Sequence, residues 1–135
     1  MKKIIILLTL VYSAFLSAND ASDNPEAFMK ELLLNKHNKA VDNYFSSNPL
    51  INEKQQQIRL VKSQINNLFN LFGNATAYEL AFKETISPSL KRFVYILKHS
   101  NHPTVWEFFI YKVKDTWISS NMSFNDNFEL LKKYQ

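Results

Sequence analysis

Histidine side chains are the first residues of this chain that could do chemistry. His99 and His102 flank a predicted turn, and two imidazoles at that spacing could hold a metal ion. A metal site usually needs a third or fourth ligand, and no acidic residue is close to this turn in the sequence. We therefore expect a solvated turn here, and the sequence predicts neither a metal site nor a cofactor.

Glutamates could supply the paired carboxylates of acid–base catalysis only if two of them shared one pocket. Glu79, Glu84 and Glu107 fall on predicted strands. Glu79 and Glu107 could face the same side of the sheet, but another strand lies between theirs, so we interpret them as surface residues. The chain's one glycine, Gly73, leaves no serine elbow and no glycine-rich phosphate loop. The sequence thus predicts no catalytic residue.

The first eighteen residues have the pattern of a secretory signal. Lys2 and Lys3 precede an apolar run over residues 4–16, and two small residues follow at 17–18. We expect cleavage after Ala18. An uncleaved anchor is the alternative, but a run of about 13 residues is shorter than the roughly 20 that a spanning helix needs. The expected product is a periplasmic or secreted bacterial protein with no stable membrane anchor.

Composition restricts the class of the mature protein. The chain contains no cysteine, so it must be stable by packing alone, without disulfides or a lipid-bearing cysteine. Its net charge of +4 falls to +2 when Lys2 and Lys3 leave with the signal. The remaining basic residues are scattered, whereas nucleic-acid binding usually requires them to cluster. We expect no nucleic-acid partner.

After a linker at residues 19–24, the period of the apolar residues predicts one α+β domain over residues 25–135. Apolar positions recur every three or four residues until Gly73, and then alternate with polar ones, as in strands. Two helices packed on a four-stranded antiparallel meander are expected, followed by a short C-terminal helix. The predicted helices cover residues 25–45 and 49–72, and the predicted strands cover residues 78–83, 90–99, 104–113 and 116–124.

The two middle strands are apolar on both faces. Trp106 and Phe108 alternate with Phe109 and Tyr111, whereas two helices can cover only one face of a sheet. The second face could be covered by a wrapping helix, a partner subunit or an apolar ligand. Alternatively, a curled sheet and the C-terminal segment could close over it. The candidate interaction or pocket residues are Tyr95, Trp106, Phe108, Tyr111 and Trp117.

These faces favour an exported, non-enzymatic binding domain that associates with a protein partner or with itself. The alternative is a pocket for a small apolar ligand, or a weak enzyme, with a cavity between the second helix and the sheet. Such a cavity would be lined by Phe69, Phe72, Phe82 and Phe93, whose other interpretation is an ordinary core.

The stretch from Trp106 to Ile118 joins an aromatic strand, a basic and acidic turn, and a tryptophan followed by an aliphatic residue. It resembles the closing hairpin of cystatin-like and NTF2-like domains, and the resemblance covers residues 77–124. That resemblance implies a curved sheet wrapped around helices, a pocket between them, and dimers formed through the sheet. This chain lacks a predicted helix after the first strand, and no catalytic role carries over to a numbered residue.

Overall fold

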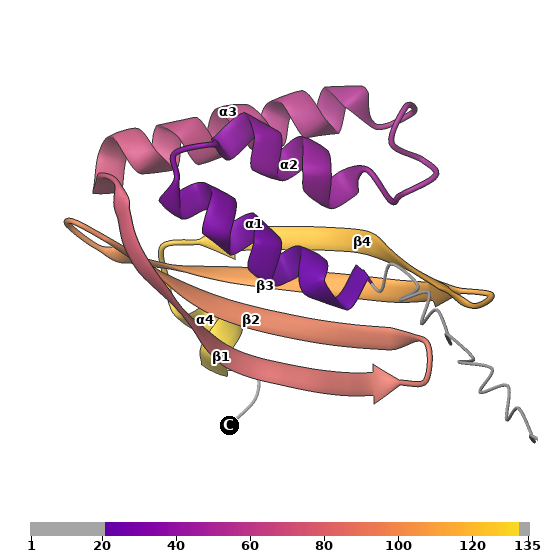
Figure 1. The fold of residues 1–135 in the computed structure, drawn as a ribbon. Coiled ribbons are helices and arrows are strands. Elements are labelled where there is room, and N and C mark those ends of the chain that lie inside the picture. Colours follow the sequence, from indigo (N-terminus) through magenta and orange to yellow (C-terminus); the bar gives the residue numbers. More distant parts are fainter. Residues whose placement is uncertain (1–20, 133–135) are drawn as a thin grey trace, which may run out of the picture.

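The computed structural model describes residues 21–132, and the predicted signal and the first two residues of the predicted linker lie outside this range. The three longer helices of the described residues stand on one side of a single sheet, and the short C-terminal helix lies on the other (Figure 1). A short 3₁₀ turn, Ala21–Asp23, leads into them. The helices are α1 (Asn24–Leu33), α2 (His37–Phe45), α3 (Gln55–Phe72) and α4 (Glu129–Lys132). The strands are β1 (Ala75–Ser87), β2 (Leu90–His99), β3 (Pro103–Val113) and β4 (Thr116–Asn125).

The predicted α+β meander is confirmed. The strands are antiparallel and lie in the order β1-β2-β3-β4, so each turn joins neighbours. β1 is longer than predicted because its pairing with β2 continues from Ala75 to Ser87 through three irregularities in register. Tight turns and period-two alternation were sufficient to predict this sheet.

The helical half differs from the prediction, since three helices precede the sheet where two were expected. Asn35 adopts a left-handed conformation (φ 56°) and ends α1. The Lys36 amide donates to the Glu31 carbonyl and the Asn35 amide to the Leu32 carbonyl. These two bonds form a Schellman motif, which stops a helix even where the apolar stripe continues. The chain then reverses into α2, which packs against α1.

The last long helix, α3, begins at Gln55 and not directly after Pro49. The Asn48 side-chain oxygen accepts the Leu50 amide (2.9 Å), and this bond closes a turn before the helix. The Asn48 amide group donates to the Ser119 carbonyl on β4 (3.0 Å). At its other end α3 stops as predicted, because Gly73 has a φ of 88° that other residues rarely adopt.

The core lies between the helices and one face of the sheet, which we call the inner face. The opposite side is the outer face. Paired residues of antiparallel strands point to the same side, so the register assigns each side chain to a face. The largest buried side chains of the core are Phe28, Met29, Leu32, Tyr44, Ile65, Trp106 and Phe108. No helix of the described residues is long and apolar enough to cross a membrane.

Candidate functional site

Three of the five candidate residues lie in the core. Tyr95, Trp106 and Phe108 share the inner face, where their exposed fractions are 4%, 0% and 0%. Phe28 of α1 packs on two of them, with ring centroids 5.6 Å from Trp106 and 5.3 Å from Phe108. The alternation of the strands was predicted correctly. The helices, however, cover the face that carries most of the large aromatic residues, so these three are not surface residues.

Trp117 and Tyr111 lie on opposite faces near the β3–β4 turn. Trp117 is half-buried on the inner face. Two lysines make cation–π contacts with its ring, with Lys91 Nζ 4.6 Å and Lys112 Nζ 5.9 Å from the ring centroid. Tyr111 is on the outer face and is 45% exposed. Of the five candidates, Tyr111 is thus the most exposed to solvent.

The outer face is closed at one end by the C-terminal segment. α4 lies on this side of the sheet, opposite α1, α2 and α3 (Figure 1). Its Leu130 and Leu131 are half-buried. His102 holds the start of the segment, because its Nε2 lies 2.9 Å from the Asp126 carbonyl and its ring stacks on Phe128. The expected alternative, a C-terminal segment folded back over the sheet, therefore describes this end.

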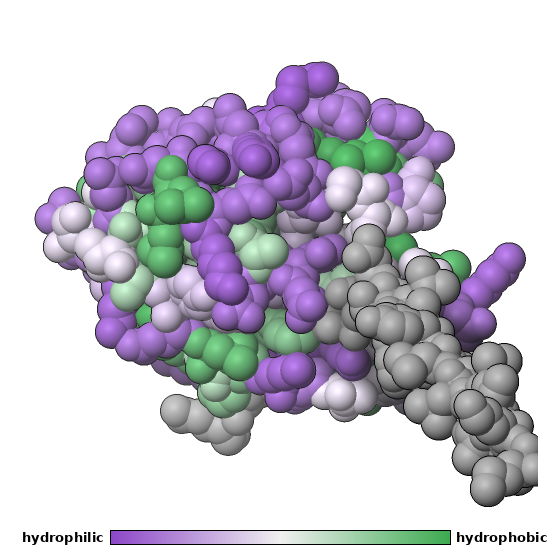
Figure 2. Space-filling view, in the orientation of Figure 1, coloured by the Kyte–Doolittle hydropathy of each residue, from purple (hydrophilic) through white to green (hydrophobic). Residues whose placement is uncertain are grey.

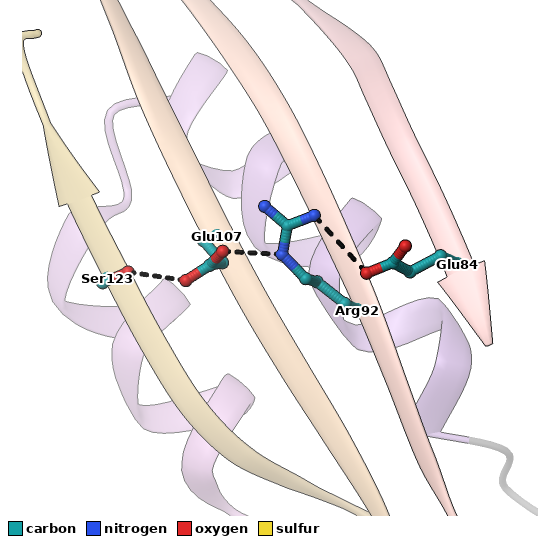
Figure 3. Close-up of polar contacts among 4 residues, drawn as sticks. All are labelled: Glu84, Arg92, Glu107 and Ser123. Atoms are coloured by element: carbon teal, nitrogen blue, oxygen red, sulfur yellow. Dashed lines mark hydrogen bonds and ion pairs between the residues drawn. The ribbon is translucent and has the colours of Figure 1, made fainter. Parts of the chain in front are cut away.

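The middle of the outer face holds a buried cation, Arg92. Its side chain is 1% exposed, and its Nε donates to Glu107 Oε2 at 2.6 Å (Figure 3). Glu84 on β1 lies 3.7 Å from the guanidinium, and the Ser123 hydroxyl donates to the second Glu107 oxygen at 3.4 Å. Side chains of all four strands meet here. We call these four residues the Arg92 cluster.

Sequence reasoning missed this cluster. Glu107 was interpreted as a surface glutamate, but its side chain is only 12% exposed. Glu79, on the same face, does form an exposed ion pair, with Lys98. The alternation of the strands could have predicted it, because Arg92 and Glu107 both point to the outer face of neighbouring strands. The register makes them diagonal neighbours, close enough for a long side chain to bridge.

The other end of the outer face is apolar and open. Tyr111 pairs directly with Leu90 on one side and with Ile118 on the other. Both of these neighbours are half-buried, and Val113 beyond them is 42% exposed. We call this surface the Tyr111 patch; it consists of Leu90, Phe109, Tyr111, Val113 and Ile118.

The helical side of the molecule looks different. In Figure 2 the surface over α1 and α2 is mainly hydrophilic, and apolar residues occur there as separate spots. Leu34, at the end of α1, is 63% exposed. Single exposed apolar residues are ordinary, whereas contiguous ones mark interaction sites.

His99 does not lie in a solvated turn as expected. It is 8% exposed, and its two ring nitrogens lie 2.8 Å from the Gly73 carbonyl and from Thr104 Oγ1. The Trp106 indole donates to the same Thr104 oxygen at 2.8 Å. The Gly73 carbonyl can only accept, so His99 Nδ1 carries a proton, and in the neutral ring Nε2 accepts the proton of the Thr104 hydroxyl. Among the described residues, no group of three or more potential metal ligands occurs.

This network predicts a loss of stability in acid. Burial holds the pKa of His99 below its usual value; the bond to Gly73 opposes this shift, and His102 and His37 add to it. As the pH falls below about 6.5, this histidine becomes protonated in the unfolded chain but stays neutral in the folded protein. The unfolded state then binds more protons than the folded state, so the free energy of unfolding decreases. We expect His99→Gln to lose less stability than wild type between pH 7.5 and pH 5, measured by urea unfolding. His102→Gln should keep most of the wild-type dependence, because burial is the main cause of the shift in His99. An unchanged slope in His99→Gln would contradict the assignment.

Comparisons with known proteins provide one structural likeness. No protein-family model matches the chain, and no curated protein matches it. A crystal structure of a DUF4783 family protein from Bacteroides uniformis ATCC 8492 is similar at a TM-score of 0.40 and 11% identity. The match covers 52% of this chain and 63% of the other. At this level the likeness is a finding that carries no functional argument.

Proposed function

We propose that this protein is an exported, non-enzymatic association domain, and that the Tyr111 patch is its binding surface for a second copy or another protein. The observation that carries the proposal is an exposed tyrosine between two apolar neighbours on the face of the sheet that the long helices leave open. Tyrosine is enriched at binding hot spots because it buries a large area and keeps a polar tip.

The composition of the patch supports association. Its core consists of side chains from three neighbouring strands, so its shape is held by the sheet and not by a loop. A rigid surface loses little conformational entropy when it binds. The Arg92 cluster borders the patch through the pairing of Arg92 with Phe109, and it adds a charged rim of the kind that surrounds apolar interface cores.

Two broader parts of the proposal are export from the cell and the resemblance to a known class of domains, both of which start from the sequence. The basic, apolar and small-residue pattern of residues 1–18 supports export, to the periplasm or out of a bacterial cell. Helices gathered on one face of an antiparallel meander support the resemblance to cystatin-like and NTF2-like domains. Under that resemblance, dimers form through the sheet, which agrees with a binding surface on its open face.

A pocket for a small apolar ligand is less well supported as the main function. Phe69 and Phe93 are buried in the core, and Phe82 lies on the outer face, so the predicted lining does not assemble. The described residues do form a hollow beside α3 of about 230 Å³. That volume is below the roughly 300–1,000 Å³ of typical small-molecule sites. A second hollow beside α3 measures about 360 Å³, but its wall includes the 68% exposed Leu71, so it does not enclose a ligand.

The test is native mass spectrometry of the purified protein with Tyr111→Glu as the variant. We expect wild type to form a dimer or carry a protein partner, and Tyr111→Glu to weaken that association at least about tenfold, since it places a charge in an apolar contact. Leu34→Glu is the matched control, because Leu34 is also exposed but lies outside the patch. A well-folded Tyr111→Glu protein with unchanged association would refute the proposal, and so would a wild type that stays a bare monomer.

A further inference from the structure

A first hollow lies between α3 and strand β4, on the inner side of that strand. It measures about 230 Å³ and has an apolar floor of half-buried and buried side chains. Lys54 is the only charged residue of its lining. The apolar residues around it are Phe45, Ile51, Ile58, Val61 and Met122.

A second hollow continues along the same two elements. It measures about 360 Å³ and lies beside the C-terminal half of α3 and the end of β4. Leu71, which is 68% exposed, forms part of its wall, and Asp126 is the only charged residue of its lining. Leu68, Phe72 and Phe124 complete its apolar surface.

The two hollows are about four strand residues apart. On β4 the first is lined by residues 120–122 and the second by residues 124–126. Four residues along a strand span about 14 Å. An extended chain lying beside β4 would therefore place its own side chains i and i+4 next to the two hollows.

β4 is an edge strand, with β3 as its only neighbour among the described residues. Its backbone is already capped at one point: Ser47 Oγ accepts the Ser119 amide at 3.0 Å, and Asn48 donates to the Ser119 carbonyl. Beyond this point the Met122 amide donates to the side chain of the preceding residue, Asn121, at 2.8 Å. A side-chain cap of this kind can be replaced by the carbonyl of an added strand.

We propose that the groove between α3 and β4 binds an extended segment of a partner protein, which adds to the sheet as a fifth strand. Its apolar side chains at i and i+4 fill the two hollows. An acidic residue lies near Lys54 and a basic residue near Asp126, because these charges stand at opposite ends of the groove. Two hollows in series beside a strand edge suit such a segment better than one compact ligand.

Two labelled peptides serve as probes, because the segment could run in either direction along β4. Their sequences are SEVTSTVKS and its reverse, SKVTSTVES, and fluorescence anisotropy reports their binding to the full-length protein. We expect at least one to bind with a dissociation constant below about 1 mM. A third peptide, with serine at both valine positions, should bind at least about tenfold more weakly.

Two exposed leucines of α3 give a matched pair of variants. Leu71→Lys places a charge in the second hollow and should weaken binding at least about tenfold, while Leu60→Lys, at a 58% exposed site outside both hollows, should leave it unchanged. Lys54→Glu should weaken binding of the probe about threefold to tenfold. A probe with lysine in place of its glutamate should bind this variant with the affinity that was lost. Circular dichroism checks that each variant is folded.

Several results would overturn the proposal. Failure of both probes to bind would do so, and so would equal losses in Leu71→Lys and Leu60→Lys. A dimer that dissociates when the probe is added would show that a second copy of this chain occupies the groove. These outcomes are independent of the Tyr111 patch, because that patch lies on the other face and Tyr111→Glu should bind the probes normally.

Discussion

Replacing Trp106 with alanine should lower the free energy of unfolding by about 4 kcal/mol, the cost typical of truncating a large buried aromatic residue. Trp106 is fully buried, stacks on Phe124 with centroids 4.5 Å apart, and contacts Phe28. The truncation also removes the indole donor from Thr104. Urea unfolding, followed by circular dichroism, measures the change.

Tyr111→Ala is the control, because it removes an aromatic side chain from the outer face of the same strand. Tyr111 is nearly half exposed, so we expect its loss to cost about 1 kcal/mol or less. The pair separates a core role from a surface role on one strand. Equal losses of stability in the two variants would mean that the faces of β3 are not divided as the structure has them.

The contrast between these two residues shows how far sequence reasoning reached. Alternation along β3 placed Trp106 and Tyr111 on opposite faces, and the register confirms this. Alternation cannot say which face the helices cover, because that depends on how α1 and α2 cross the sheet. The structure shows that they cover the Trp106 face, so the exposed candidate is Tyr111 and the buried ones stabilise the fold.

The predicted boundaries of the first helix were wrong for a related reason. The apolar stripe over residues 28–45 continues through Asn35, and a stripe contains no information about a single left-handed residue. Asparagine adopts this conformation more readily than most residues, so Asn35 among polar neighbours was the available signal. The break matters for the site, because it lets α1 and α2 lie side by side and brings Tyr44 onto the sheet. There its hydroxyl donates to the Asn121 carbonyl (2.9 Å) on β4.

The groove beside β4 could not be predicted, since it depends on the turn that precedes α3. Sequence reasoning started this helix at Pro49, whereas residues 49–54 form turns and leave space beside β4. Long-range bonds set this arrangement: Asn48 and Ser47 both bind Ser119, more than seventy residues later in the chain. Contacts at that separation leave no local pattern in the sequence.

Removing Glu107 should have an effect nearly as large as removing Trp106. In Glu107→Ala the Arg92 guanidinium keeps its charge at a site that is 1% exposed but loses its closest carboxylate, which lies at 2.6 Å. Breaking a buried ion pair on one side typically costs about 3–5 kcal/mol, because the remaining charge stays desolvated. We expect about 3 kcal/mol in urea unfolding, since Glu84 remains 3.7 Å from the guanidinium.

Glu84→Ala is the matched control for this prediction. Glu84 is 44% exposed and farther from Arg92, so its removal should cost less than about 1 kcal/mol. Replacing both partners of the closer pair, as Arg92→Met with Glu107→Leu, should recover most of the stability lost in Glu107→Ala, because no buried charge is left. If the double variant were instead the least stable of the series, the pair would be a net source of stability on the open face of the sheet. The Tyr111 patch would then be held in place by the Arg92 cluster beside it, and the same double variant should weaken association as well as folding.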